Sequence, residues 1–175
     1  MHPIRAGATQ TAAIEAIAEL LSKLRLDFAF VGGVARSAWL GSTFDRGAVD
    51  VLGLMKPEQK DQIAMMAHNR GFDVSREEIE QTEELDVIPM RFEGVRVHVL
   101  IASNALYGRM IAASTQTAFN GRDVRVATAE DLAVLAIVGD DDDTADALTS
   151  LPSFDREGLK RKLVTIGLGG VVSGE

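Results

Sequence analysis

Apolar residues recur every three or four positions along residues 9–24. Ile14, Ile17, Leu21 and Leu24 fall on one side of a helix with that period. The pattern predicts an amphipathic helix whose apolar side covers one face of a β-sheet, with a threonine at the start of the segment as its N-cap.

Two short apolar runs follow, at residues 27–31 and 48–55. Each has the length of a buried strand, and the first is apolar enough for a central position in a sheet. Between them lie Gly32 and Gly33, a segment with helical spacing, and a turn-rich stretch at residues 41–47. The order predicted is therefore strand, double glycine, helix, turn, strand.

The second half of the chain predicts a hairpin and several helices. Residues 86–92 and 95–101 alternate as strands do and are joined by Glu93-Gly94, a hairpin signal. Helices are expected at residues 57–69, 106–118 and 129–138, from residue 144 and from residue 156, and a further strand near residues 124–128. Strands mixed with helices predict an α/β protein with a mixed sheet flanked by helices.

The double glycine is the first candidate for chemistry. Glycines at the end of a strand let another group approach the backbone, and the uncapped N–H groups of the following helix attract anions. Gly32, Gly33 and Arg36 are therefore candidates for binding the phosphates of a nucleotide. A tight turn without a ligand, and an arginine that faces solvent or an acid, explain the same residues.

Two polar residues interrupt the apolar runs. Because side chains alternate along a strand, Ala48 and Asp50 share one face of their strand, and Arg96 and His98 share one face of theirs. We expect Asp50 to have a polar partner, since an unpaired buried carboxylate is costly. Asp50 and His98 are candidate metal ligands that suit zinc or manganese better than magnesium, and a neutral histidine hydrogen-bonded to an aspartate is the alternative.

From about Leu26 to Leu151, the arrangement resembles the nucleotidyltransferase fold, in particular small bacterial proteins of the AbiEii and minimal-nucleotidyltransferase type, which include toxin–antitoxin components. The resemblance implies a strand with two acids one residue apart and a third acid on a later strand. Those acids would hold two divalent ions that clamp a nucleoside triphosphate. It also places Val95–Ile101 as the third-acid strand and Val124–Leu132 after the core.

This chain departs from the pattern at the acids. Ala48 stands in the place of the first acid, Asp50 in that of the second, and His98 in that of the third. A lysine frequent in the later helix of the family is replaced by Ala136. Asp45, Glu84 and Asp86 are the acids that could substitute for the missing ligands.

Composition excludes several classes of function. The chain has 175 residues, 46% of them hydrophobic, and no cysteine, so it forms no disulfide or thiolate metal site. No apolar run approaches the ~20 residues that cross a bilayer, and no signal-peptide pattern is present, so we expect a cytoplasmic protein. The net charge of −8, with lysines and arginines dispersed along the sequence, argues against a nucleic-acid partner and is compatible with a basic protein partner.

Runs of acids are interpreted as solvated surface. Residues 76–84 carry Glu77, Glu78, Glu80, Glu83 and Glu84, and residues 140–143 are all aspartate, without the ligand spacing of a calcium loop. Residues 1–155 are expected to form the nucleotidyltransferase-like domain. Residues 156–175 are expected to add a helix and a glycine-rich tail.

Two hypotheses for function follow from the resemblance. The first is a pseudoenzyme that has lost the two-metal centre, needs no cofactor, and acts as a protein-interaction or regulatory module, with a nucleotide retained at most as a ligand. The second is an active enzyme that transfers a nucleoside monophosphate from a triphosphate with Mg²⁺, using Asp50 and a substitute acid.

Overall fold

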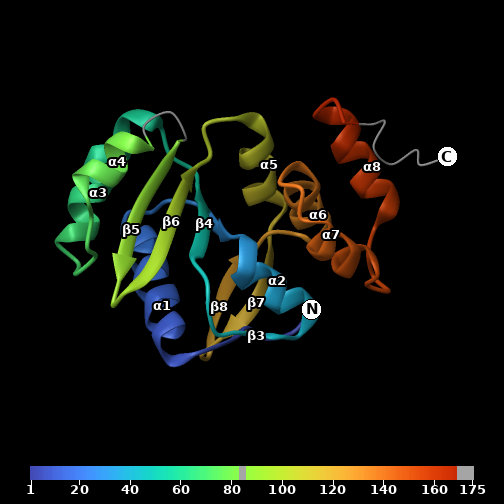
Figure 1. The fold of residues 1–175 in the computed structure, drawn as a ribbon, viewed down its shortest axis with the longest axis horizontal. Helices are drawn as coiled ribbons and strands as arrows, with labels where there is room; N and C mark the ends of the chain where they lie inside the picture. Colours follow the sequence, from blue (N-terminus) through green and yellow to red (C-terminus); the bar gives the residue numbers. More distant parts are fainter. Residues whose placement is uncertain (83–85, 169–175) are drawn as a thin grey trace. The chain divides into compact units, whose positions relative to one another are not determined.

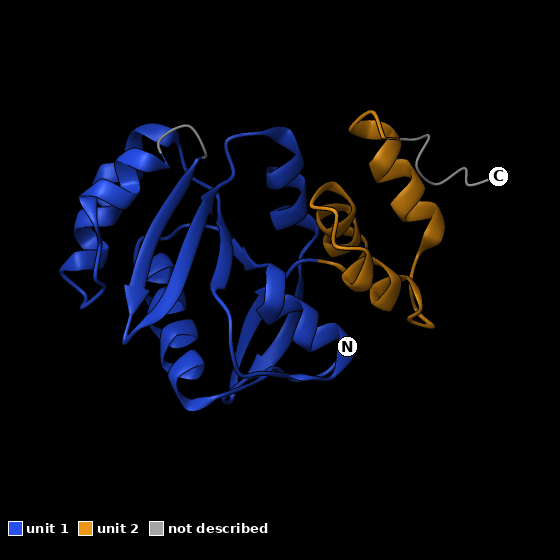
Figure 2. Ribbon diagram, in the orientation of Figure 1, with its two compact units in different colours: residues 1–127 blue, residues 128–175 orange. Residues whose placement is uncertain are grey.

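A computed structural model describes residues 1–82 and 86–168 of the chain. By their contacts, the residues fall into two compact units, Met1–Ala127 and Thr128–Glu175 (Figure 2). The domain boundary expected at residue 155 stays a prediction, and it falls between the last two helices of the second unit.

A six-stranded mixed sheet forms the centre of the first unit (Figure 1). Its strands lie in the order β5-β6-β4-β2-β8-β7, which makes β4 and β2 central. β4 runs parallel to β6 and antiparallel to β2, and β2 runs parallel to β8. The bounds are β2 Phe28–Phe30, β4 Val49–Gly53, β5 Val87–Phe92, β6 Val95–Ile101, β7 Thr115–Phe119 and β8 Arg122–Val126. The predicted mixed α/β architecture is confirmed.

Helix α1 (Ala8–Lys23) covers one face of this sheet and lies behind β4, β5 and β6 in Figure 1. Its apolar side is buried, including Ile14, Ile17 and Leu21, as its spacing predicts. The valines of β4 and β6 that face it are completely buried: Val49, Val51, Val97 and Val99. The core of the first unit therefore lies between α1 and this face of the sheet, which we call the valine face.

The other helices of the first unit surround the sheet. They are α2 (Gly32–Leu40), the short 3₁₀ helix η1 (Pro57–Gln59) with α3 (Lys60–His68), α4 (Arg76–Gln81) and α5 (Ala105–Ala113). A small parallel pair, β1 (Arg5–Ala6) and β3 (Thr43–Phe44), joins the N-terminal segment to the turn before β4. Within residues 1–82 and 86–168, no helix is both long and apolar enough to cross a membrane.

One predicted helix is too long. The segment 106–118 was expected to be helical throughout, but α5 ends at Ala113 and Thr115–Phe119 form the edge strand β7. β7 pairs with β8 from Thr115↔Val126 to Phe119↔Arg122. Thr115, Gln116 and Thr117 alternate as a strand does, and pairing with β8 outweighs their modest preference for a helix.

The second unit contains three helices, α6 (Ala129–Val138), α7 (Asp142–Thr149) and α8 (Arg156–Thr165). Thr128 caps α6 by accepting a hydrogen bond from the backbone N–H of Asp131, as its sequence predicts. Asp131 is buried and forms an ion pair with Lys162 of α8, which joins the two helices. α7 begins two residues before the expected start at Thr144, with Asp141 as its N-cap, so Asp142 and Asp143 occupy its first turn.

Candidate functional site

Asp50 lies in the middle of β4, between β2 and β6. Its neighbours Val49 and Val51 point to the covered valine face, so Asp50 points to the opposite side of the sheet. His98 of β6 is its direct partner in the parallel pairing. The face that carries Asp50, His98, Pro89, Arg91 and Arg96 is called the Asp50 face, because Pro89 pairs with His98 and Arg91 with Arg96 across β5 and β6.

Asp50 and His98 form a hydrogen-bonded pair. The distance between His98 Nδ1 and Asp50 Oδ1 is 2.8 Å, and about a third of each side chain is exposed, 34% for His98 and 29% for Asp50. The predicted polar partner of Asp50 is thus His98. The contact occupies one oxygen of the Asp50 carboxylate and one nitrogen of the His98 ring, and it does not involve Asp50 Oδ2 or His98 Nε2.

Gly32 brings bare backbone against the same carboxylate. Its φ of +53° lies in the left-handed region, and a Cβ atom built at this position would lie 2.6 Å from Asp50 Oδ2. Both the backbone conformation and the close approach require glycine here. A phosphate at the start of α2 would therefore meet the negative charge of Asp50.

Gly33 serves packing. A Cβ atom built on Gly33 would lie 2.7 Å from Cε2 of Phe44, whose ring is buried. Phe44 belongs to β3, which is held in place by its pairing with β1. The space beside Gly33 on that side is thus filled by an aromatic ring, a contact that the turn-rich sequence around Phe44 did not reveal.

Arg36 is the fifth residue of α2, because the helix already begins at Gly32. It is exposed and already interacts with another part of the chain. Gly32, Gly33 and Arg36 therefore share one helix, and their role in nucleotide binding stays a prediction.

The side chains present do not fit a two-ion centre. Ala48 offers no ligand atom. Asp45 is exposed and lies 3.6 Å from Arg46, and Asp86 accepts a 2.5 Å hydrogen bond from Ser103. Glu84 lies outside the described residues. Within the ranges that the structure describes, no three His, Asp or Glu side chains come close enough to hold a metal ion, and Mg²⁺ requires several oxygen ligands.

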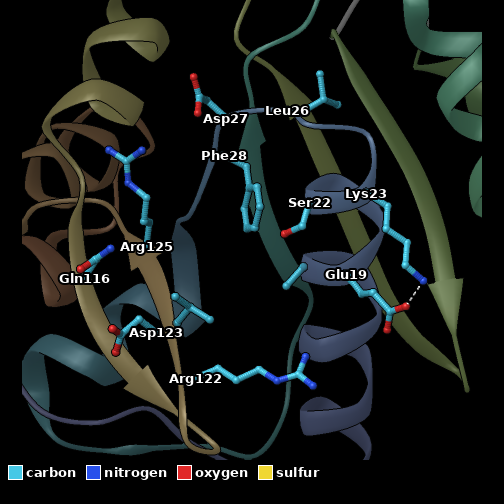
Figure 3. A pocket seen from close by; sticks show the side chains of 12 residues that line it. Glu19, Ser22, Lys23, Leu26, Asp27, Phe28, Gln116, Arg122, Asp123 and Arg125 are labelled. Carbon is cyan, nitrogen blue, oxygen red and sulfur yellow. Dashed lines mark hydrogen bonds and ion pairs between the residues drawn. The ribbon is translucent and has the colours of Figure 1, made fainter.

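A large hollow lies on another part of the first unit (Figure 3). It has a volume of about 490 Å³ and is lined by residues of α1, among them Glu19 and Lys23, and by residues of β7 and β8. In Figure 3 the side chain of Arg122 extends from β8 toward α1. No residue of the Asp50 face and none of Gly32, Gly33 and Arg36 lines it. It is therefore separate from the candidate site.

Sequence reasoning placed Arg96 on the face of His98 but missed its pairing with Arg91. Arg91 and Arg96 are directly opposite each other in the β5–β6 ladder, and Arg96 precedes Val97, the partner of Val49, so it lies toward the Ala48 end of β4. The hairpin turn at Glu93-Gly94 contained this information, since a two-residue turn places Arg91 opposite Arg96.

Comparisons with solved structures identify the fold. ANT(2'')-Ia in complex with adenylyl-2''-tobramycin matches with a TM-score of 0.60 and 17% identity, over 91% of this chain and 98% of that one. This chain has a nucleotidyltransferase-like fold. The lincosamide antibiotic adenylyltransferase LnuA, bound to lincomycin, matches with a TM-score of 0.54 and 11% identity, over 78% of this chain and 94% of its own.

A third similar structure is an antigenic nucleotidyltransferase-like protein from Paracoccidioides brasiliensis, with a TM-score of 0.60 and 16% identity over 94% of this chain and 89% of that one. No protein-family model and no curated protein matches the sequence. Identities this low support the nucleotidyltransferase-like fold and leave the activity to be argued from the site.

Proposed function

We propose that this nucleotidyltransferase-fold protein acts by binding a protein partner and does not transfer nucleotides. The observation that carries the proposal is the Asp50–His98 hydrogen bond, in a strand pair where the fold's resemblance calls for metal-binding acids. With Ala48 as the neighbour of Asp50 on the same face, two of the three expected ligands are replaced by a methyl group and an imidazole.

The energetic argument is that the metal ions supply most of the catalysis in phosphoryl and nucleotidyl transfer. They neutralise the charge that develops on the phosphate oxygens and hold the attacking and leaving groups. The loss of one carboxylate from such a centre costs several kcal/mol of transition-state stabilisation, a factor of about a thousand or more. The Asp50 carboxylate, already bonded to His98, does not compensate for that loss.

A second function is favoured by the solved structures with a similar fold. LnuA is a lincosamide antibiotic adenylyltransferase, and ANT(2'')-Ia binds adenylyl-2''-tobramycin. This chain has a similar fold and carries one acid, Asp50, on the central strand β4. Transfer by this chain would require a further acid to join Asp50, drawn from Asp45, Asp86 or Glu84. The exposed ion pair of Asp45 and the hydrogen bond of Asp86 weigh against the first two.

The decisive experiment compares metal dependence in the wild type and in a restored variant. Thermal unfolding would be recorded with ATP, GTP, CTP or UTP, each in EDTA, Mg²⁺ or Mn²⁺, together with transfer of α-labelled nucleoside monophosphate. We expect no increase in stability that requires the metal, because a ligand stabilises only the state that it binds. Metal-dependent stabilisation or transfer that disappears in Asp50→Asn would overturn the proposal.

The double variant Ala48→Asp/His98→Asp is the matched positive control. It places carboxylates at the two positions that lack them and leaves Asp50 in place. We expect this variant, and not the wild type, to be stabilised by Mn²⁺ with a triphosphate. Failure of both proteins to respond would be consistent with the proposal only if the variant is shown to be folded by circular dichroism.

The partner is tested separately. The net charge of −8 favours a partner with a basic surface. A protein recovered with the wild-type chain would be purified and its affinity measured by calorimetry at two salt concentrations. We expect binding that weakens with salt and is unchanged by Asp50→Asn. The absence of a saturable complex with any recovered protein would contradict this part of the proposal.

A further inference from the structure

Three arginines meet at the turn end of the β5–β6 hairpin, two from the hairpin itself and one from a distant part of the sequence. Arg46, Arg91 and Arg96 line a hollow of about 440 Å³ together with Glu93. We call it the arginine hollow. Arg46 comes from the segment before β4, and the other two come from neighbouring strands of the hairpin. A hollow of this volume is within the range of small-molecule sites.

The pairing of Arg91 with Arg96 places like charges side by side. The two residues are direct partners in the antiparallel ladder, an arrangement that is unfavourable unless a negative group lies between them. Glu78 lies 3.4 Å from Arg91, and both side chains are nearly half exposed, at 42% and 43%. In the described part of the chain, Arg96 has neither an ion pair nor a hydrogen bond. Its charge is therefore available to a ligand.

The first turn of α1 also lines the arginine hollow, through Thr9 and Gln10. α1 is 16 residues long, begins after Gly7, and has no acid in its first turn. No side chain of the described residues caps its first N–H groups. These groups and the positive end of the helix dipole favour an anion at the same place as the arginines.

The charge of the arginine hollow contrasts with that of the larger hollow in Figure 3. The larger one combines Lys23, Arg122 and Arg125 with an equal number of carboxylates, Glu19, Asp27 and Asp123. The arginine hollow is lined by three arginines and a single glutamate. Arg46 and Arg91 also have acidic neighbours outside the lining, whereas Arg96 forms no ion pair with any described residue. In a chain with a net charge of −8, this concentration of positive charge distinguishes it from the larger hollow.

We propose that the arginine hollow binds the diphosphate group of a small phosphorylated molecule without a metal ion. Arginine presents a planar set of donors that matches phosphate oxygens, and Arg91 and Arg96 come from adjacent strands of a rigid hairpin. The N–H groups of α1 supply donors from a third direction. The proposal goes beyond the absence of catalysis proposed above and does not depend on it.

The test uses isothermal titration calorimetry of the full chain in EDTA, with inorganic pyrophosphate, inorganic phosphate, ADP and a tetraglutamate peptide as probes. We expect pyrophosphate to bind more tightly than phosphate. Arg96→Gln should weaken pyrophosphate binding at least about tenfold, since a hydrogen bond to a charged group is lost. Arg122→Gln, in the charge-balanced hollow, is the matched control and should leave the affinity within about twofold.

The ADP arm identifies the source of the diphosphate. Equal affinities for ADP and pyrophosphate assign recognition to the phosphates alone, and tighter binding of ADP assigns a nucleotide as the ligand. Both results support the site if Arg96→Gln abolishes the difference in affinity between pyrophosphate and inorganic phosphate. Tighter binding of tetraglutamate than of pyrophosphate would overturn the proposal in favour of an acidic peptide.

The position of the ligand is checked by amide chemical shifts in ¹⁵N-labelled protein. Pyrophosphate should move the amides of Ala8 and Thr9 and leave those of Gly32 and Gly33 in place. Shifts confined to Gly32 and Gly33, or an affinity unchanged in Arg96→Gln, would overturn the assignment. A metal-dependent effect at Asp50 would instead contradict the function proposed above, so the two failures are distinguishable.

Discussion

The two faces of β4 and β6 differ in polarity around Asp50 and His98, although their residues alternate along the same strands. Val49, Val51, Val97 and Val99 are fully buried on the valine face, where α1 contacts both strands. On the Asp50 face, His98 and Asp50 keep about a third of their side chains exposed. The covered face holds the sheet together, and the open face can change its residues at little cost. We therefore expect substitutions to cost more stability on the valine face than on the Asp50 face.

The largest expected effect is the burial of a charge on the valine face. Val97→Asp places a carboxylate where the side chain is completely buried. An uncompensated buried charge costs about 3–5 kcal/mol, a large part of the ~5–15 kcal/mol that stabilises a typical domain. Urea unfolding should show a strongly lowered midpoint or an unfolded protein.

Arg96→Asp is the matched control, since it introduces the same group one position before Val97 in β6, on the open face, where the side chain is exposed. We expect a loss of less than about 1.5 kcal/mol, because the new carboxylate remains partly hydrated. Equal losses for the two variants would show that the faces do not differ as described.

The next effect concerns the glycines of the candidate site. Gly33→Val should destabilise the protein by about 1–3 kcal/mol, because the new side chain overlaps the Phe44 ring. Gly108→Val in α5 is the control: no atom lies within 4 Å of a Cβ built there, so the change should stay within about 0.5 kcal/mol. If Gly33→Val were as mild as Gly108→Val, the space beside Gly33 would be open to a ligand after all.

Sequence reasoning identified the buried residues of the valine face and, on the Asp50 face, the Asp50–His98 pair. The spacing of Ile14, Ile17 and Leu21 and the alternation in the strands specify which residues are buried, because burial follows directly from helical and strand periods. The Asp50–His98 pair was also within reach, since both residues interrupt apolar runs. The helical spacing and the alternation along each strand are local patterns, and the sequence displays them directly.

The remaining features of the site depend on contacts between segments that are distant in the sequence. The ring of Phe44 lies against Gly33, and Arg46 lines the same hollow as Arg91 and Arg96. Both arrangements depend on the path of the turn before β4 and on the hairpin register, which composition does not encode. Arginines that are dispersed in the sequence can gather in space. The strand β7 was missed for a similar reason, because its pairing with β8 decides a segment whose intrinsic preference is weak.

A smaller effect measures the Asp50–His98 bond itself. A double-mutant cycle with Asp50→Ala and His98→Ala should give a coupling of about 0.5–1.5 kcal/mol, as expected for a hydrogen bond that is partly exposed. The exposed pair Arg76–Glu80 in α4 is the control, with an expected coupling of about 0.3–0.5 kcal/mol. Unfolding in urea supplies both values. A coupling near zero for Asp50 and His98 would mean that the pair does not hold the open face in order.

The smallest effect lies on the solvent side of α1, opposite the residues that cover the valine face. The hydrogen bond from Lys23 lowers the pKa of Glu19, with a further contribution from the charge of Lys23 and smaller ones from Arg70 and Arg122. A lowered pKa in the folded state stabilises the protein above the pKa of the unfolded chain. That stabilisation is lost as the pH falls through the folded pKa, in the acidic range below the usual glutamate value.

Lys23→Met removes the main cause, so the pKa of Glu19 should rise toward its ordinary value in an NMR titration of the Glu19 carboxyl carbon. Arg70→Gln, which removes a charge 3.6 Å from the same carboxylate, should raise the pKa of Glu19 by less. Because about half of the Glu19 side chain is exposed to solvent, at 52%, neither change should measurably alter the unfolding midpoint at neutral pH. A larger rise in Arg70→Gln than in Lys23→Met would place the controlling charge in the turn after α3 rather than within α1. The pKa of Glu19, on the outer side of α1, would then depend mainly on the neighbouring segment, just as the burial of the inner side of α1 depends on the sheet.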